Sequence, residues 1–294
     1  MADPQEPQEP QEPQEPQPYT RWAAVLGSPV GHSLSPALHR AAYRSLGLAG
    51  WSYDAIECRA GELPAWLEQA RADARFAGYS LTMPLKVTAV PLVDVLEPLA
   101  GRVGAVNTVT RRAGELVGSN TDVPGMVLAL SEAGITGAQH AVVLGAGGSA
   151  QAALAALAEL GRPPVVALVR RPERAAALLG VADAVGVALE VRPWGDVPET
   201  DLVIATTPAG ATDELAAAVA AGHWPSGAAL FDILYAPWPT PLAAAVLARG
   251  ERVVGGAELL VAQALGQVEL MTGRSVPTAV LRAAMDDAPA VRGS

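Results

Sequence analysis

An apolar segment that runs directly into a glycine-rich turn most constrains what this chain can fold into. Residues 141–144 read AVVL, residues 145–150 read GAGGSA, and an alanine- and leucine-rich helical stretch follows over 151–160. Glycines in such a turn let the backbone approach a pyrophosphate, and the following helix offers free N–H groups and a favourable dipole. The pattern predicts a strand, a turn and a helix that together bind a dinucleotide.

Strand-like and helix-like segments alternate along the rest of the chain. Short apolar runs predict strands at 22–26, 51–57, 76–81, 105–110, 115–118, 141–144, 165–169, 202–205, 229–233 and 253–254. Helical spacing predicts helices at 36–46, 62–72, 85–95, 124–133, 151–160, 258–271 and 277–285. This alternation is typical of an α/β fold with mostly parallel sheets. A boundary near 122–124, without a long linker, predicts a ligand cleft between two halves.

Composition narrows the classes of protein that fit. Of 294 residues, 50% are hydrophobic and 17% charged, which is enough apolar material for a sizeable core. The net charge of −10 argues against binding to nucleic acid or to an anionic membrane. We find no leader and no membrane-spanning apolar run, so neither secretion nor a span is expected. The single cysteine, Cys58, excludes a disulfide framework and a cysteine-based zinc site, and fits a reducing cytoplasm.

The N-terminus differs in composition from everything after it. Residues 4–18 read PQEPQEPQEPQEPQP, a three-residue repeat with no apolar face. Such a segment buries nothing, so we expect a disordered, polyproline-like tail over 1–18. A solvated extension is the favoured interpretation, and a partner-binding segment is the alternative.

Two residue types are rare enough to draw attention to their positions. Lys86 is the only lysine among 20 basic residues, and Asn107 and Asn120 are the only asparagines. The pKa of an ammonium group shifts with its surroundings, so a lysine can release its proton, whereas a guanidinium stays protonated. A retained lysine therefore suits proton transfer. When a lysine and an aspartate such as Asp122 are brought together, each shifts the pKa of the other and the two can share a proton. Taken singly, a surface lysine, a turn asparagine and a capping aspartate remain the favoured interpretations.

The residues after the predicted strand 165–169 indicate which dinucleotide is bound. A protein that binds NAD usually has an acidic residue there, which holds the ribose 2′-hydroxyl. Here Arg170 and Arg171 follow the strand, Arg174 comes one helical turn later, and Glu173 is the only acid nearby. Guanidinium groups suit a 2′-phosphate. We predict NADP, with a solvated basic loop as the alternative.

A loop after the first predicted strand carries two alternate hydroxyls. Residues 27–36 read GSPVGHSLSP, which places Ser33 and Ser35 just before a helix. They suit a substrate carboxylate or hydroxyl, or a helix cap. On spacing alone, Ser35 as an N-cap before Pro36 is the favoured interpretation.

Six motifs in one order resemble the shikimate dehydrogenase family: SPVGHSLSP, SLTMPLK, GAVNT, NTDVPG, GAGGSA and LVAQA. The resemblance covers about residues 22 to 285. It implies an α/β substrate domain at 19–122, a Rossmann NADP domain at 123–254 and C-terminal helices at 255–288 that return to the first domain. It also implies NADPH-dependent, reversible reduction of 3-dehydroshikimate to shikimate by a cytoplasmic monomer or homodimer. We expect the protein to bind no metal, no nucleic acid and no membrane.

The resemblance assigns roles residue by residue. Lys86 and Asp122 match the catalytic pair. Substrate contacts are implied for the polar side chains of Ser33, Ser35, Thr82, Asn107, Tyr235 and Gln263. Cofactor contacts are implied for Gly145, Ala146, Gly147, Gly148, Ser149, Ala150, Arg170, Arg171, Arg174, Thr206, Gly256 and Leu259.

The chain departs from the family pattern in four places. Ser80 and Ala205 stand where asparagines are usual, and Leu259 stands where a methionine commonly lies against the nicotinamide. The arginine segment is one residue tighter before Arg174, which leaves open which arginine grips the phosphate. The alternatives are a quinate/shikimate dehydrogenase, generally NAD-linked, an aminoshikimate-pathway paralogue, or a non-enzymatic dinucleotide-binding protein.

Overall fold

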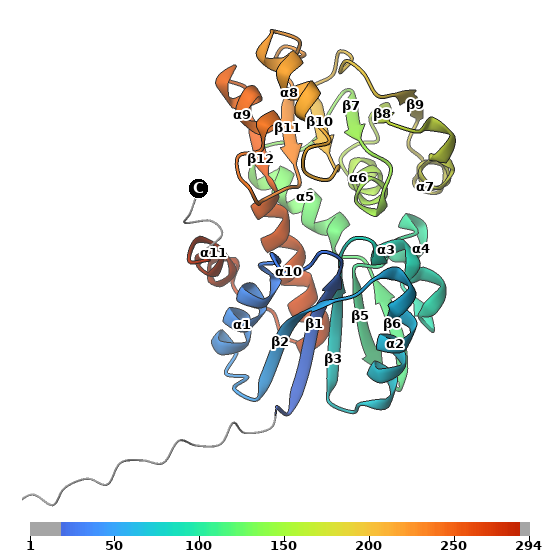
Figure 1. Ribbon diagram of the computed structural model, residues 1–294, viewed down its shortest axis with the longest axis vertical. Helices are drawn as coiled ribbons and strands as arrows, with labels where there is room; N and C mark the ends of the chain where they lie inside the picture. Colours follow the sequence, from blue (N-terminus) through green and yellow to red (C-terminus); the bar gives the residue numbers. More distant parts are fainter. Residues whose placement is uncertain (1–18, 289–294) are drawn as a thin grey trace, which may run out of the picture.

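Two α/β halves, each built around a six-stranded sheet, are stacked along the long axis of the molecule (Figure 1). The computed structural model describes residues 19–288, so the predicted tail at 1–18 lies outside the described residues. No helix of this described part has the length and apolar character needed to span a membrane.

The first sheet is mixed, with strand order β2-β1-β3-β5-β6-β4. β1 pairs in parallel with β2 and β3, whereas β5 pairs antiparallel with β3 and β6. Its strands are β1 (Arg21–Gly27), β2 (Trp51–Glu57), β3 (Phe76–Leu81), β4 (Val95–Leu96), β5 (Thr108–Arg112) and β6 (Glu115–Ser119). The β5–β6 hairpin thus reverses the chain inside a sheet that begins as a parallel one.

Helices cover both faces of this sheet. Those formed by its own half are α1 (Ser35–Ser45), α2 (Leu63–Ala72), α3 (Leu85–Thr88) and α4 (Pro98–Val103). The predicted helix 85–95 is wrong beyond Thr88, because Pro91 falls in a separate 3-10 turn, Val90–Leu92. The predicted N-cap at Ser35 is also wrong: the cap position is Leu34, and no side chain caps the helix. β4 and α4 were not predicted, because both are short.

The second sheet is wholly parallel, with order β12-β11-β10-β7-β8-β9. Its strands are β7 (Ala141–Leu144), β8 (Val165–Val169), β9 (Leu189–Pro193), β10 (Leu202–Ala205), β11 (Ala229–Asp232) and β12 (Val253–Gly255). Its helices are α5 (Asp122–Glu132), α6 (Gly148–Glu159), α7 (Ala176–Val185), α8 (Asp213–Ala220) and α9 (Pro241–Ala248). This doubly wound arrangement confirms the predicted fold class.

The last two helices, α10 (Gly256–Thr272) and α11 (Thr278–Asp286), return to the first half and pack on α1 (Figure 1). α10 also packs against α5 and against strands β3 and β5. A Cβ on Gly125 of α5 would lie 3.0 Å from the backbone nitrogen of Gln263 in α10. Small residues therefore let the two helices cross closely at the junction of the halves.

Gly256, the first residue of α10, has almost no space around it. A Cβ built there would lie 2.1 Å from the carbonyl oxygen of Ile233, a backbone atom of the loop after β11. A side chain at this position must therefore displace either α10 or that loop.

We predict that Gly256→Ala lowers the melting temperature by several degrees, because overpacking against backbone typically costs about 1–3 kcal/mol. Gly61→Ala is the matched control, since a Cβ at Gly61 would meet nothing within 4 Å. Thermal unfolding of the two variants checks this. Equal melting temperatures would show that the contact at Gly256 relaxes without cost.

Candidate active site

Lys86 and Asp122 meet at the junction of the two halves. Lys86 lies in the short helix α3 after β3, and Asp122 is the first residue of α5 after β6. Lys86 Nζ donates to Asp122 Oδ2 at 2.7 Å, and the two side chains are 17% and 6% exposed. An ion pair this far from water gains little stability, because removing both charges from solvent is costly. The position is better suited to chemistry than to holding the fold.

Asn107 holds the other oxygen of Asp122. Its amide Nδ2 donates to Asp122 Oδ1 and to Thr121 Oγ1, both at 2.9 Å. Its Oδ1 accepts from Thr108 Oγ1 at 2.9 Å and from the Thr121 backbone N–H at 2.8 Å. Both donors and both acceptor positions of the amide are occupied within the protein. The contact with a substrate hydroxyl implied for Asn107 stays a prediction.

Asn120 fixes the start of α5. Its Oδ1 accepts from the backbone N–H groups of Asp122 and Val123 at 3.0 and 3.2 Å. Its Nδ2 donates to the carbonyl oxygen of Ala105 at 2.9 Å. The side chain thus ties the first turn of α5 to the segment before β5. The rarity of asparagine marked this position, but its role in orienting Asp122 was not predicted.

Ser33 and Tyr235 come from different halves and meet. Burial raises the pKa of Tyr235, and hydrogen bonds with the Leu34 backbone and the Ser33 side chain oppose that rise. Ser33 Oγ also accepts from the Ser35 backbone N–H at 3.3 Å. Ser35 itself is buried, at 4% exposure. Hydroxyls from both halves are therefore gathered beside the N-terminus of α1.

The other two residues implied in substrate binding lie nearby in the fold. Thr82 follows β3, and a Cβ on Gly27 would come within 2.2 Å of its Cγ2. Gln263 lies on α10, where its Nε2 donates to the Leu260 carbonyl oxygen at 2.9 Å. The role of each side chain toward substrate stays a prediction.

The glycine turn between β7 and α6 lies beside Lys86. Gly145 has a φ of +112°, and a Cβ there would approach Thr206 Oγ1 to 2.9 Å. A Cβ on Gly147 would meet nothing within 4 Å, so the bare backbone at the N-cap of α6 is open. A Cβ on Gly148 would lie 3.3 Å from Lys86 Cβ. The predicted pyrophosphate turn and the predicted acid–base pair are therefore adjacent.

The remaining residues of the predicted cofactor site surround this turn. Ala146 and Ser149 are half-buried and Ala150 is buried. Thr206 follows β10 and donates its hydroxyl to the Leu144 carbonyl oxygen at 2.7 Å. Leu259 lies in the apolar core shared by α5, α6 and the second sheet. Its predicted contact with the nicotinamide is not tested by this packing.

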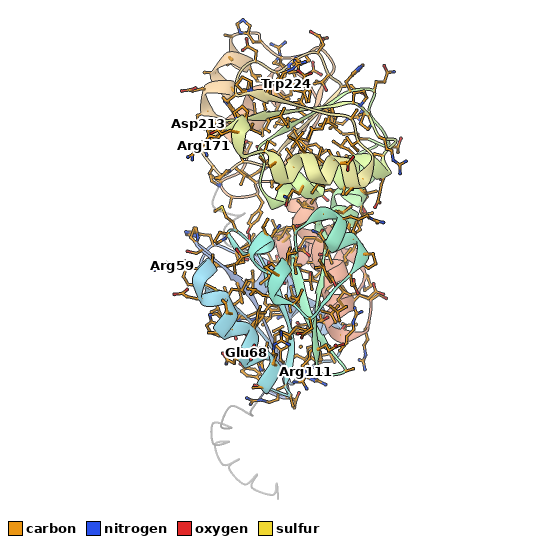
Figure 2. All side chains as sticks on the ribbon, turned by 90° about the vertical axis from the view of Figure 1, so that its right-hand side faces the viewer. Arg59, Glu68, Arg111, Arg171, Asp213 and Trp224 are labelled. Atoms are coloured by element: carbon orange, nitrogen blue, oxygen red, sulfur yellow. The ribbon has the colours of Figure 1, made fainter. Side chains whose placement is uncertain are left out.

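Arg170 and Arg171 follow β8 directly, as predicted from the sequence, and both are exposed. Figure 2 shows Arg171 at the surface of the upper half. Within residues 19–288, neither guanidinium is engaged by an ion pair or side-chain hydrogen bond. Both are therefore available to a phosphate. The side chain of Arg174 is outside what the structure describes.

A buried polar network behind Asn107 was not predicted. It consists of His39, Tyr53, Ser80 and Gln267, which come from α1, β2, β3 and α10. Burial lowers the pKa of His39 from 6.5 to about 3, and a hydrogen bond with Gln267 opposes this only in part. His39 stacks on Tyr53 with ring centroids 3.9 Å apart. The sequence offered one indirect signal, the serine at position 80 in place of the family's asparagine.

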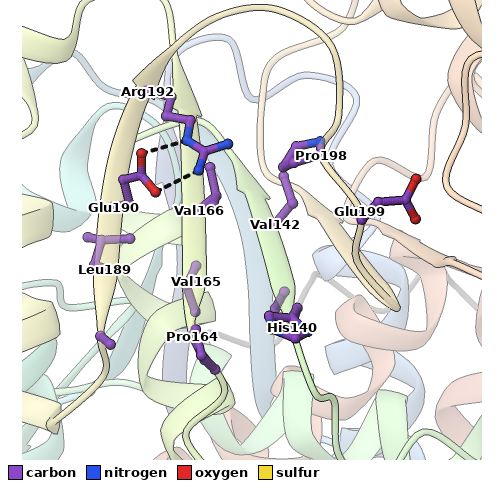
Figure 3. A pocket seen from close by; sticks show the side chains of 12 residues that line it. His140, Val142, Pro164, Val165, Val166, Leu189, Glu190, Arg192, Pro198 and Glu199 are labelled. Carbon is purple, nitrogen blue, oxygen red and sulfur yellow. Dashed lines mark hydrogen bonds and ion pairs between the residues drawn. The ribbon is translucent and has the colours of Figure 1, made fainter.

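A cavity in the second half of the molecule does not coincide with these residues. A cavity of about 420 Å³ lies against β7, β8 and β9 (Figure 3). It is lined among others by His140, Val166 and Pro198 and bordered by the Glu190–Arg192 ion pair. It contains none of the residues predicted for substrate or cofactor. We therefore place the candidate active site at Lys86 and Asp122.

Comparison with known proteins gives concordant matches. Residues 25–109 match the family model described as the shikimate dehydrogenase substrate binding domain. A shikimate dehydrogenase (NADP(+)) from Moorella thermoacetica is 38% identical over 271 residues, which cover 89% of this chain and 91% of that protein. One from Thermus thermophilus is 40% identical over 250 residues, covering 85% and 92%.

Solved structures agree. A Mycobacterium tuberculosis shikimate dehydrogenase matches with a TM-score of 0.82 and 40% identity, covering 91% of this chain and all of that one. A Thermus thermophilus shikimate 5-dehydrogenase in complex with NADP(H) and shikimate matches with a TM-score of 0.77 and 36% identity, over 90% and 98% of the two chains.

The depressed pKa of His39 predicts how stability depends on pH. Because the folded state holds His39 neutral down to about pH 3 and the unfolded chain protonates near 6.5, the contribution of His39 is complete above pH 6.5 and is lost as pH falls. From pH 6.5 to 5.0 the free energy of unfolding should fall by about 2 kcal/mol through this group.

Urea unfolding of the wild type and His39→Phe at both pH values measures this. His39→Phe keeps a ring against Tyr53 and should remove the extra pH dependence. His140→Gln changes an exposed histidine and should retain it. A His39→Phe protein with the same pH dependence as wild type would show that His39 protonates freely in the folded state.

Proposed function

The chain belongs to the shikimate dehydrogenase family, and we propose that Lys86 and Asp122 carry its proton transfer. The enzyme catalyses the reversible NADPH-dependent reduction of 3-dehydroshikimate to shikimate. Bound NADPH supplies the hydride that reduces the ketone carbon. As the hydride arrives, the ketone oxygen gains negative charge and needs a proton. The observation that carries the proposal is the 2.7 Å contact between Lys86 Nζ and Asp122 beside the glycine turn.

The geometry of the pair suits a proton donor. An ammonium group has three hydrogens, and Lys86 uses one of them on Asp122. The others are free to face a substrate oxygen, while Asp122 holds the Nζ in place. Asp122 in turn is held by Asn107 and by the capped first turn of α5. In the reverse direction, the same Lys86, once deprotonated, accepts the proton of the shikimate hydroxyl.

We assign the substrate contacts to polar groups around this pair. The meeting of Ser33 and Tyr235 supports a site for the substrate carboxylate, because both present hydroxyls at one place. Ser35 lies in the same loop. Thr82, Asn107 and Gln263 are proposed for the ring hydroxyls, and Asn107 would reach one by exchanging its hydrogen bond to Thr121 Oγ1 for one to the substrate. A site that hydrogen-bonds each hydroxyl discriminates against analogues that lack one.

The residues present fit an NADP cofactor. The open backbone at Gly147 and the uncapped N-terminus of α6 suit the pyrophosphate, with Gly145, Ala146, Gly148, Ser149 and Ala150 completing the turn. Thr206, Gly256 and Leu259 are proposed to line the nicotinamide side. Arg170, Arg171 and Arg174 are proposed to hold the 2′-phosphate.

We further propose which part of the chain binds which ligand and in which compartment the enzyme acts. Residues 19–122 bind substrate, 123–254 bind the cofactor, and 255–288 close the chain onto the first part. We propose a cytoplasmic enzyme that acts as a monomer or homodimer. The lone cysteine supports the cytoplasmic setting, and the net charge of −10 argues against a role for nucleic acid or an anionic membrane.

Lys86→Ala should lower kcat by about 10²–10⁴, the usual effect of removing a general acid. The dissociation constant for NADP should change little, because Lys86 acts on the substrate side. Lys86→Arg should restore little, since a guanidinium does not release its proton. Initial rates at 340 nm and cofactor titration measure both effects. A kcat near that of wild type in either variant removes Lys86 from the mechanism.

Replacing both Arg170 and Arg171 with alanine should weaken NADP by at least about 10-fold, since each charge-assisted hydrogen bond contributes roughly 1.5–3 kcal/mol. NAD lacks the phosphate, so its kcat/KM should change little. Arg249→Ala removes an exposed guanidinium elsewhere on the same half and is the control. The assignment fails if wild type prefers NAD or if the double variant keeps its preference for NADP. Quinate, assayed beside shikimate, separates the quinate-using alternative.

A further inference from the structure

We propose that Gln267 is a positioning residue for the Lys86–Asp122 pair, a role that rests on the function proposed above. Gln267 lies on α10 and is 1% exposed. It does not touch Lys86 or Asp122. Its side chain instead links the buried network of His39, Tyr53 and Ser80 to Thr108, which donates to Asn107, and Asn107 in turn donates to Asp122.

The orientation of the Gln267 amide is fixed by a backbone carbonyl. Its Nε2 lies 3.1 Å from the carbonyl oxygen of Asn107. A carbonyl oxygen only accepts hydrogen bonds, so the amide must turn its NH₂ group toward it. The amide oxygen then faces Ser80 Oγ at 2.8 Å and His39 Nε2 at 3.3 Å, which both donate to it. Tyr53 completes this side by donating its hydroxyl to Ser80 Oγ at 2.6 Å.

His39 is suited to this arrangement only in one form. To donate to the Gln267 oxygen, its proton must lie on Nε2. Nδ1 is then an acceptor, and it is buried with no partner in the described structure. Burial that keeps His39 neutral preserves this form. The ring stacked on Tyr53 therefore acts as a fixed donor that helps to stop the Gln267 amide from turning over.

Gln267 in turn sets the direction of the Thr108 hydroxyl. The second hydrogen on Nε2 points to Thr108 Oγ1 at 3.2 Å. Since that oxygen accepts from Gln267, the single hydroxyl hydrogen of Thr108 is directed to Asn107 Oδ1 at 2.9 Å. The Thr121 N–H donates to the same Oδ1. With its oxygen held by two donors, the Asn107 amide must present its NH₂ group to Asp122.

The hydrogen bonds of the network therefore all point in the same direction from donor to acceptor. From Tyr53 they pass through Ser80, Gln267, Thr108 and Asn107 and end on Asp122 Oδ1. Lys86 binds the opposite oxygen of the same carboxylate. A reversal at Gln267 would turn an acceptor toward the Asn107 carbonyl and release the Thr108 hydrogen. The position of Asp122, and with it that of Lys86 Nζ, depends on a side chain carried by the returning helix α10.

The single lysine of the chain provides a direct probe of this dependence. Protein grown with lysine labelled with ¹³C at Cε gives one lysine side-chain signal, that of Lys86. In Gln267→Leu, which keeps the approximate size but removes the amide, we expect this signal to shift at fixed pH. Val268→Ala removes packing from the next residue of α10, whose side chain lies in the separate core with α1 and α11. It should lower stability and leave the Lys86 signal in place.

The same variants are compared by steady-state kinetics. Gln267→Leu should lower kcat by about 10-fold or more, since a small misplacement of a catalytic group costs up to about 100-fold. The KM for NADP should stay near that of wild type, and Val268→Ala should keep wild-type kcat. If Gln267→Leu does not fold, Thr108→Val interrupts the network at the next link, and Thr108→Ser, which keeps the hydroxyl, should retain more kcat than Thr108→Val.

The inference is overturned by a folded Gln267→Leu with the wild-type Lys86 signal and kcat, or by an equal loss in Val268→Ala. Equal kcat in Thr108→Val and Thr108→Ser also overturns it. The activity of Lys86→Ala separates this failure from that of the proposed function. An inactive Lys86→Ala beside an active Gln267→Leu leaves the proton-transfer role standing and removes only the positioning role.

Discussion

The contact between Lys86 and Asp122 is the interaction around which the candidate active site is arranged. Both charges are largely withdrawn from water, at 17% and 6% exposure, so the pair gains little from attraction alone. It persists because Asp122 also receives a hydrogen bond from Asn107, and because Asn120 caps the turn that carries it. Two strand ends of the first sheet, after β3 and after β6, bring the two residues together. A partly buried charged pair that is held in place by these hydrogen bonds is suited to exchange a proton with a substrate.

The second constraint is the close return of α10. Gly125 allows α5 to approach α10, and Gly266 of α10 would place a Cβ 3.1 Å from Thr121 Cγ2. Because α5 begins at Asp122 and α10 carries Gln263 and Gln267, this crossing aligns residues that are separated by nearly half the chain. The glycine turn before α6 lies against Lys86 from the other side. Substrate-side and cofactor-side elements thus share one small region.

Much of this was predictable from local sequence. The alternation of strands and helices predicted mostly parallel sheets, and the second sheet is wholly parallel. The family resemblance, the activity and NADP are confirmed by relatives that match over most of the chain. The single lysine and the two asparagines marked residues that the structure brings together.

What local sequence did not predict is the buried polar network behind these residues. Gln267, Ser80 and His39 are each ordinary residues in apolar or helical stretches, and only the packing of α10 on the first sheet makes them neighbours of Asn107. The capping prediction at Ser35 failed for a related reason, since the loop turns Ser33 toward Ser35 and Tyr235 instead.

The most direct test of the account is a crystal structure of this protein with NADP⁺ and shikimate bound. The account predicts that the shikimate hydroxyl to be oxidised lies about 2.7–3.2 Å from Lys86 Nζ, with Lys86 still bonded to Asp122. The substrate carboxylate should lie among Ser33, Ser35 and Tyr235. A hydroxyl held by another side chain, with Lys86 Nζ beyond about 4 Å and facing solvent, would contradict the central claim.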